Sequence, residues 1–371
     1  MKFTIERAAL LKSLGHAQSV VERRNTIPIL ANVLVRVAQQ AVSFAATDMD
    51  LEFVESATAE VGRTGTVTAP AHTLYDIVRK LPEGAQVELT AANTNQMTLS
   101  AGRSHFKLGC LPVEDFPQMS EGALPHKFSL SAPDLCTIID RTRFAISTEE
   151  TRYYLNGIYL HTMSANNIDV LRAVATDGHR LARIEIPAPQ GAKGMPGIII
   201  PRKTVQEIRK LLDEETGTVE ISLSETKIRF AFGQVVLTSK LIDGTFPDYE
   251  KVIPSANDKT MEIEVRAFAA AVDRIATIAS EKTRAVKLAL APGHLTVSAS
   301  SPEAGSATEE LEAKYEGALI DVGFNARYLL DITQQIKGDG LRLTLADAAA
   351  PVIVQDVADA SALYVIMPMR V

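Results

Sequence analysis

One segment of the sequence combines residue types that could perform acid–base chemistry. Asp177-Gly178-His179-Arg180 places a carboxylate and an imidazole two residues apart, and such a pair could exchange protons with a substrate. However, no serine or cysteine stands in a nucleophile-elbow context such as G-x-S-x-G. Thr47-Asp48-Met49-Asp50, 129 residues before Thr176, keeps the Thr-Asp pair and lacks the Gly and His. A glycine turn with a structural histidine is the favoured interpretation, and a hydrolase using Asp177 and His179 is the alternative.

Metal ions, cofactors and nucleotides are not expected from the sequence. The seven histidines do not pair at helical ligand spacing, and neither H-E-x-x-H nor C-x-x-C occurs. Two isolated cysteines, Cys110 and Cys136, cannot form a multi-thiolate site, and they fit a reducing cytosol. The glycine-containing stretches 62–65 and 191–197 lack the lysine or the helix start that a phosphate loop needs.

Length and composition indicate the number of domains and the cellular location to expect. A length of 371 residues suggests two or three domains, and the absence of Trp with 5% aromatic residues predicts aliphatic cores. No apolar run is long enough to span a bilayer, and the segment 1–7 does not have the features of a signal peptide. We therefore expect a cytoplasmic protein that does not bind membranes.

The elements that would position any site recur three times along the chain. A short alternating strand runs into an amphipathic helix, and the apolar positions match at offsets of 125 and then 133 residues. The second copy has a capping-box pattern, Ser131-x-x-Asp134, with Pro133 in the first turn. The matching positions are Phe3, Ile5, Leu10 and Leu14; Phe128, Leu130, Leu135 and Ile139; and Met261, Ile263, Phe268 and Val272.

A second strand–helix block also recurs, at offsets of 131 and 124 residues, with Pro70, Pro201 and Asn325 at the helix starts. A third block, Leu111…Phe116-Pro117, reappears 130 residues later as Leu241…Phe246-Pro247. Strand-like segments such as 33–37, 157–161, 285–290 and 295–299 fill the rest of the units. We expect an α+β protein of three similar domains, 1–125, 126–253 and 254–371, each with two helices and antiparallel sheets.

Charge is distributed unevenly between the predicted helices and the remainder. The six helix windows 6–24, 71–81, 131–144, 201–213, 265–279 and 325–337 carry 16 basic and 9 acidic residues. The rest of the chain carries 22 basic and 36 acidic residues, and the net charge is −7. Basic helices lining a channel would attract DNA phosphates without regard to base sequence, which permits sliding. Solvated helix faces are the alternative interpretation.

Long collinear motifs make the whole chain resemble the beta subunit of bacterial DNA polymerase III. These motifs are Lys2-Phe3-Thr4, Ile27-Pro28-Ile29-Leu30, Arg152-Tyr153-Tyr154-Leu155-Asn156-Gly157, Ala175-Thr176-Asp177-Gly178-His179-Arg180-Leu181, Pro201-Arg202-Lys203, Ser239-Lys240-Leu241-Ile242-Asp243-Gly244-Thr245-Phe246-Pro247-Asp248-Tyr249 and Tyr364-Val365-Ile366-Met367-Pro368-Met369-Arg370. The resemblance implies a non-catalytic sliding clamp, a head-to-tail homodimer that closes into a six-domain ring around double-stranded DNA. Helices would line the hole and sheets would form the outer wall.

The resemblance also implies which residues make each contact. Phe106, Leu108 and Ile278 match positions in the dimer interface, where one sheet extends another. Arg24, Tyr153 and Tyr154 match DNA contacts. Together with the charge pattern, this gives the expected DNA-facing set Arg24, Arg79, Lys80, Arg141, Tyr153, Tyr154, Arg202, Lys203 and Lys210.

A partner-peptide pocket is implied between the second and third domains. Its expected occupants are extended peptides of the polymerase III alpha subunit, the clamp-loader delta subunit, translesion polymerases, mismatch-repair proteins and ligase. Methionines suit a surface that accepts varied apolar side chains, although core packing is the alternative for Met367 and Met369. The matching residues are Leu155, Thr176, Gly178, His179, Arg180, Leu181, Pro247, Val252, Asn325, Tyr328, Val365, Met367, Pro368, Met369 and Arg370.

Some positions depart from the family pattern. Thr283, Lys251 and Val371 replace a Phe, an Arg and a Leu, and Ala349 and Pro351 also differ. We expect these changes to alter which peptides the pocket rim prefers while the pocket itself is kept. A DNA-binding protein that forms no closed ring is a further alternative, and it would be a monomer in solution.

Overall fold

The computed structural model describes the chain except for residues 24–25, 94, 121, 166–167, 281 and 371. The chain forms two compact units. The first comprises Met1–Leu135, Pro189–Ala192 and Lys203–Leu241, and the second comprises Cys136–Ala188, Lys193–Arg202 and Ile242–Val371. No helix among the described residues is both long and apolar enough to cross a membrane.

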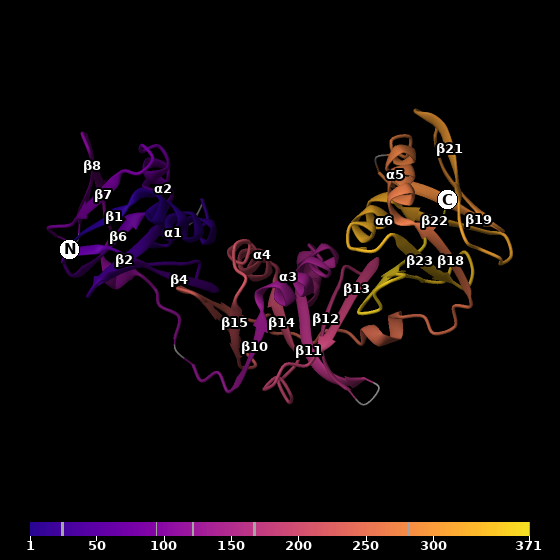
Figure 1. Cartoon of the computed structure of the whole chain (residues 1–371), viewed down its shortest axis with the longest axis horizontal. Coiled ribbons are helices and arrows are strands. Elements are labelled where there is room, and N and C mark those ends of the chain that lie inside the picture. Colours follow the sequence, from indigo (N-terminus) through magenta and orange to yellow (C-terminus); the bar gives the residue numbers. More distant parts are fainter. Residues whose placement is uncertain (24–25, 94, 121, 166–167, 281, 371) are drawn as a thin grey trace. The chain divides into compact units, whose positions relative to one another are not determined.

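The predicted strand–helix blocks are confirmed at all six places (Figure 1). In the first type of block, β1 (Lys2–Glu6) leads into α1 (Arg7–Val20), β10 (His126–Ser131) into α3 (Ala132–Asp140), and β18 (Lys259–Glu264) into α5 (Val265–Ala276). In the second type, β6 (Gly65–Pro70) leads into α2 (Ala71–Arg79), β14 (Ile198–Pro201) into α4 (Arg202–Leu211), and β22 (Ile320–Asn325) into α6 (Ala326–Thr333).

Polar side chains at equivalent positions begin several of these helices. The carboxylate of Glu6 accepts hydrogen bonds from the N–H groups of Ala8 and Ala9, and Glu264 does the same for the start of α5. The Ser131 hydroxyl accepts from the N–H of Asp134 at 3.1 Å and donates to the Asp134 carboxylate at 2.6 Å. The capping function predicted for this pair is therefore confirmed, because the free N–H of a helix start is satisfied by a side chain.

The strands pair antiparallel throughout the described residues and form four sheets. The first sheet has the order β5-β1-β7-β8-β9, where β5 is Glu60–Arg63, β7 is Gln86–Thr90, β8 is Gln96–Ala101 and β9 is Ser104–Gly109. The second has the order β10-β15-β16-β17-β4-β3-β2-β6. Its further strands are β2 (Asn32–Ala38), β3 (Ala41–Thr47), β4 (Leu51–Thr58), β15 (Thr218–Leu223), β16 (Lys227–Phe232) and β17 (Val235–Lys240).

The other two sheets belong to the second unit. The third has the order β14-β11-β12-β13-β25-β24-β23-β18, and the fourth has the order β21-β20-β19-β22. Their further strands are β11 (Gly157–Ala165), β12 (Ile168–Thr176), β13 (Arg180–Pro187), β19 (Ala285–Ala291), β20 (His294–Ser301), β21 (Gly305–Glu312), β23 (Gly340–Leu345), β24 (Val352–Asp356) and β25 (Ala362–Ile366). The expected α+β class and antiparallel sheets are confirmed.

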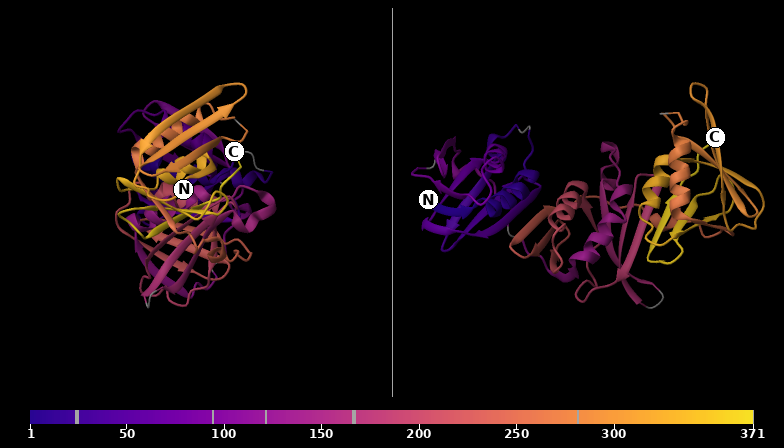
Figure 2. Two further views of the ribbon diagram at one scale, coloured as in Figure 1. Left: turned by 90° about the vertical axis from the view of Figure 1, so that its right-hand side faces the viewer. Right: turned by 45° about the horizontal axis from the view of Figure 1, so that its top comes forward.

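Apolar faces hold helices and sheets together. Helix α1 packs on α2, β3 and β4, and it buries Leu10, Leu14 and Ala17, which lie on one side of a helix because of its 3.6-residue period. Helix α5 packs on α6 and on strands β19, β20 and β21 in the same way, as the orange helix beside its sheet shows (Figure 2). The cores are largely aliphatic, as the composition predicts.

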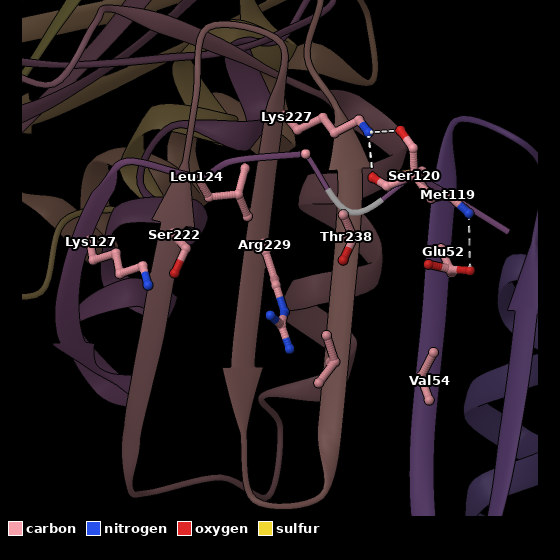
Figure 3. Close-up of a pocket in the computed structure, with 12 residues that line it drawn as sticks. Glu52, Val54, Met119, Ser120, Leu124, Lys127, Ser222, Lys227, Arg229 and Thr238 are labelled. Carbon is pink, nitrogen blue, oxygen red and sulfur yellow. Dashed lines mark hydrogen bonds between the residues drawn. The ribbon is translucent and has the colours of Figure 1, made fainter.

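A hollow of about 460 Å³ lies on the second sheet, on the face opposite its buried side chains (Figure 3). Lys127, Ser222, Arg229, Thr238 and Glu52 follow one another across five adjacent strands and form its floor. The linker after β9 crosses the hollow and is fastened on both sides. The N–H of Met119 donates to Glu52, and the Lys227 ammonium donates to the Ser120 carbonyl at 2.7 Å.

Candidate functional site

The segment that could have performed acid–base chemistry is a tight turn between β12 and β13. The Asp177 carboxylate accepts hydrogen bonds from the N–H groups of His179 and Arg180 at 2.9 and 3.0 Å. The Thr176 hydroxyl donates to the Arg180 carbonyl at 2.7 Å and accepts from the N–H of Gly178. Gly178 has a φ of +88°, a conformation that favours glycine.

The same turn occurs in the first repeat, between β3 and β4. Thr47 accepts from the N–H of Met49 at 3.0 Å, and Asp48 accepts from the N–H groups of Asp50 and Leu51 at 3.0 and 2.7 Å. The interpretation of this Thr-Asp pair as a turn motif is therefore confirmed. In the described part of the chain, no three His, Cys, Asp or Glu side chains gather as a metal site.

Arg180 fastens this turn to the rest of the second unit. Its side chain is 8% exposed, and its Nε and Nη1 atoms lie 3.1 Å from Asp177 and 2.5 Å from Asp331. Nη2 donates to the carbonyl of Phe144 at 2.6 Å, and the guanidinium lies 4.4 Å from the centre of the Tyr328 ring. Because each guanidinium nitrogen donates to an acceptor within the second unit, Arg180 orients the turn and α6 relative to each other.

The C-terminal segment lies beside the same turn. The N–H of Met367 donates to the His179 carbonyl at 2.9 Å, and the N–H of Met369 donates to the Gly323 carbonyl at 2.8 Å. The His179 ring stacks on Tyr328, with centroids 6.2 Å apart. Tyr328 lies on α6, where the Asn325 side chain caps the N–H of Arg327 at 3.0 Å, and burial raises the pKa of the Tyr328 hydroxyl. The turn, the tail and α6 are thus brought together.

Apolar residues of the expected peptide pocket divide into a buried group and an exposed group. Leu155, Leu181 and Val365 are at most 4% exposed and belong to one core with Phe246 and Tyr249. Val252 and Met367 are 44% and 38% exposed, whereas large apolar side chains are mostly buried in this chain. Pro247 and Arg370 are exposed, and Pro368 and Met369 are half-buried. The exposed members are the ones that could contact a partner.

The expected DNA-facing residues differ in how available their charges are. Arg202 and Lys80 are exposed, and Tyr153 is 54% exposed with its ring edge-on to the half-buried Tyr154. Arg79 and Lys210 are exposed and paired with Asp76 and Glu207 on their own helices. Lys203 is paired with Glu22 and Asp48. Arg24 lies outside the described residues.

Arg141 is a correction to this set. Its residue is 8% exposed, and its Nη1 atom donates to Asp359 at 2.6 Å and to Ser361 at 3.2 Å. The hydrogen bonds from Ser361, together with the Arg141 guanidinium, lower the pKa of the Asp359 carboxyl to about 2. A buried, paired guanidinium cannot reach a phosphate, so the prediction of a DNA-facing Arg141 is wrong.

Two of the three residues expected at a subunit interface lie at the edge of a sheet. Phe106 and Leu108 are on β9, the last strand of the first sheet, where they pair with Leu99 and Met97 of β8. Ile278 is half-buried just beyond the end of α5.

Lys251, one of the departures from the family pattern, is exposed and paired with Asp248, and Thr283 is exposed in a loop. Val371 lies outside the described residues.

Sequence reasoning missed the residues that support the site from behind. Asp331 and Phe144 hold Arg180, and Gly323 holds the tail, yet none of them is among the expected pocket residues. A buried arginine needs a carboxylate partner, but the sequence pattern does not identify which carboxylate supplies it.

Comparison with known proteins places the chain in a family. Sequence models of the N-terminal, central and C-terminal domains of the DNA polymerase III beta subunit match residues 1–120, 129–248 and 250–370. A curated beta sliding clamp from Caulobacter vibrioides is 53% identical, with both chains covered completely. A crystal structure of the Bartonella birtlesii sliding clamp bound to griselimycin is 50% identical with a TM-score of 0.97, over 100% of both chains. A structure of the Caulobacter crescentus clamp with bound polyethylene glycol is 53% identical with a TM-score of 0.98, over 100% of this chain and 99% of that one. The chain therefore belongs to the DNA polymerase III beta subunit family, the non-catalytic sliding clamps of bacterial DNA replication.

Proposed function

We propose that two copies of this chain join head to tail into a closed ring around double-stranded DNA. The observation that carries the proposal is the way in which the repeats join inside the chain. Each repeat contributes two sets of four strands. In the first repeat these sets are β1-β7-β8-β9 and β4-β3-β2-β6, and the other two repeats contain sets with equivalent strand orders. The proposed domains are 1–125, 126–253 and 254–371.

Equivalent strands make both internal junctions. Strand β17 of the second repeat pairs with β4 of the first, and β25 of the third repeat pairs with β13 of the second. The corresponding strands left over are β9 of the first repeat and β21 of the third, and each is an edge of its sheet in the described residues. Pairing of β9 with β21 of another copy would repeat the internal junction and leave neither edge open. Phe106 and Leu108 lie on β9, which supports the expected interface.

The ring would hold DNA by topology. Within their observed bounds the six helices carry 10 basic and 6 acidic residues, in a chain whose net charge is −7. Weak phosphate contacts of this kind are independent of base sequence and permit sliding. The proposed DNA-facing residues are Arg24, Arg79, Lys80, Tyr153, Tyr154, Arg202, Lys203 and Lys210, and the proposed place of action is the cytoplasm.

The turn 176–180, α6 and the C-terminal tail would form the surface that captures replication and repair proteins. Exposed Val252 and Met367 offer apolar contacts to the side chains of an extended peptide. The griselimycin-bound relative supports a ligand surface of this kind. The proposed partners are the polymerase III alpha subunit, the clamp-loader delta subunit, translesion polymerases, mismatch-repair proteins and ligase.

Light scattering tests the ring. We expect a species near twice the 40.1 kDa of the chain. Phe106→Asp combined with Ile278→Asp should produce a monomer with an unchanged circular dichroism spectrum. Leu319→Asp is the matched control, because Leu319 is 77% exposed and is not part of the proposed interface. A wild-type monomer, or dissociation by the control alone, contradicts the proposal.

Release from DNA tests enclosure separately. The loaded wild-type protein should leave linear duplex DNA quickly by sliding off the ends, and it should remain on closed circular DNA. Equal release from both DNA forms would favour a DNA-binding protein that forms no ring.

His179→Ala should weaken binding of a polymerase alpha-subunit peptide, whereas the hydrolase alternative would require loss of a measurable turnover.

A further inference from the structure

A buried arginine beneath the proposed peptide surface is tied to the segment that carries Val252. Arg172, on β12, is 4% exposed. Its Nη1 atom donates to the Tyr249 hydroxyl at 2.7 Å and to the Glu250 carboxylate at 2.6 Å. Its Nη2 atom lies 2.6 Å from the Glu185 carboxylate of the neighbouring strand β13.

Tyr249 and Glu250 begin a short 3-10 helix, η5 (Tyr249–Val252), which ends with the exposed Val252. The Tyr249 ring is buried in the core that contains Leu155, Leu181 and Val365. Two different attachments therefore hold η5 to the second unit, an apolar one through the ring and a polar one through Arg172. The polar attachment sets direction as well as position, because a guanidinium donates in a fixed plane.

The polar attachment continues beyond the tyrosine. The Tyr249 hydroxyl lies 2.9 Å from Nε2 of His161, and Nδ1 of His161 lies 3.4 Å from the Thr162 carbonyl. A neutral His161 with its proton on Nδ1 fits both contacts, since Nε2 then accepts the proton of the hydroxyl that Arg172 donates to. The Tyr159 ring stacks on His161 and on Phe246, with centroid distances of 4.7 and 4.8 Å.

We infer that Arg172 is a positioning residue for the partner-peptide surface and acts on it through Tyr249 and Glu250. It holds η5 so that Val252 stands out of the core in a fixed place, with Pro247 just before the same segment. The inference rests on the proposed function, because it assumes that Val252 contacts the peptide. It concerns a residue that lies outside the expected pocket and is buried, so that it acts on a ligand only through its neighbours.

A purely structural role for Arg172 is the competing explanation, and the chain provides a matched control for it. Glu185 pairs with the same guanidinium and lies on β13, whereas Glu250 and Tyr249 lie on η5. Glu185→Gln removes a carboxylate charge from Arg172, and from Arg183 at 3.4 Å, and leaves the residues of η5 unchanged. Tyr249→Phe combined with Glu250→Ala keeps the buried ring and removes both links between η5 and Arg172.

The test measures griselimycin binding to the full-length protein by calorimetry, with Met367→Ala as a third variant. We expect Tyr249→Phe/Glu250→Ala to bind roughly fivefold or more weakly, because a loosened segment must be ordered again on binding. Glu185→Gln should bind like the wild type. Amide hydrogen exchange at residues 250–253 should speed up in the double variant and stay unchanged in Glu185→Gln.

The outcomes separate the inference from the proposed function. If the double variant binds and exchanges like the wild type, or if Glu185→Gln weakens binding equally, Arg172 has no positioning role. If the wild type does not bind griselimycin, or if Met367→Ala binds unchanged, the proposed peptide surface is in the wrong place. The exchange measurement then still decides whether Arg172 holds η5.

Discussion

Arginine residues of the second unit form two groups that differ in burial. Arg141, Arg172 and Arg180 are buried, and each guanidinium is paired with at least one carboxylate from a distant part of the chain. Arg202 and Arg370 are exposed. The buried group connects strands and helices, and the exposed group is available to DNA or to a partner.

Arg180→Ala should destabilise the second unit by about 3 kcal/mol, because removing one partner leaves the carboxylates of Asp177 and Asp331 without their cation. Urea denaturation followed by circular dichroism measures the change, since the chain has no Trp to report by fluorescence. Arg370→Ala is the control and should be nearly neutral. A stable Arg180→Ala protein would mean that the buried ion pairs are dispensable.

Acidification should lower the free energy of unfolding of the second unit, because His161 binds a proton more readily in the unfolded chain. Burial lowers the pKa of His161 in the folded protein below its ordinary value of 6.5, although Glu250 and Glu185 act in the opposite direction. As the pH falls below about 6.5, the unfolded chain binds the proton first, so the free energy of unfolding decreases until the folded-state pKa is reached. Denaturation midpoints at pH 7.5 and 5.5 should differ less for His161→Gln than for the wild type. Identical pH dependence in both proteins would count against this assignment.

The candidate site could be predicted only in part. The turn 176–180 was recognisable from its Thr-Asp-Gly pattern, and its interpretation as a turn holds because the first repeat makes the same hydrogen bonds. The pairing of Arg141 with Asp359 and of Arg180 with Asp331 was not recognisable, since these carboxylates lie 218 and 151 residues away. Periodicity in a sequence reports which face of an element is apolar, and it does not report which distant element covers it.

At the scale of the element, the sequence predicts where the helices start more accurately than where they end. All six starts agree with the predicted windows to within one residue, because capping residues such as Glu264 and Asn325 act locally. The ends fall two to four residues early. Just beyond α3 the Thr142 hydroxyl donates back to the Ile138 carbonyl, and the chain continues as a short 3-10 turn. Such back-bonding competes with helix continuation, and sequence pattern alone does not reveal it.

Ser131→Ala should destabilise α3 by about 1 kcal/mol, because the N–H of Asp134 loses its acceptor. Thermal melting followed by circular dichroism measures the loss. Ser129→Ala is the control, since Ser129 is exposed on the preceding strand β10. If both variants melt alike, the hydroxyl of Ser131 does not act as a cap.

At the scale of the whole molecule, the location of positive charge matters more than its sum. Arg202 and Lys210 are exposed on α4, whereas Arg36 and Arg229 are exposed on strands. Because helices are proposed to face DNA and sheets to face outward, the same charge change should have different effects at the two places.

Arg202→Glu with Lys210→Glu should weaken binding to a short linear duplex by about tenfold at low salt, because two phosphate contacts are lost. Arg36→Glu with Arg229→Glu is the matched control and should bind nearly as the wild type does. Fluorescence anisotropy at several salt concentrations measures both. Equal weakening would show that only net charge matters, and the proposed lining by helices would then be wrong.

The edge strands β9 and β21 have a further consequence for direction. They belong to different repeats, so copies that join through them all point the same way around the ring. A ring of this kind has two unlike faces, and every copy presents its turn 176–180 and its C-terminal tail toward the same one. Any protein captured there would meet the enclosed duplex with one polarity, whichever subunit it binds. Synthesis of DNA proceeds in one direction along its template, and the open edges of this chain would give the tether a matching direction.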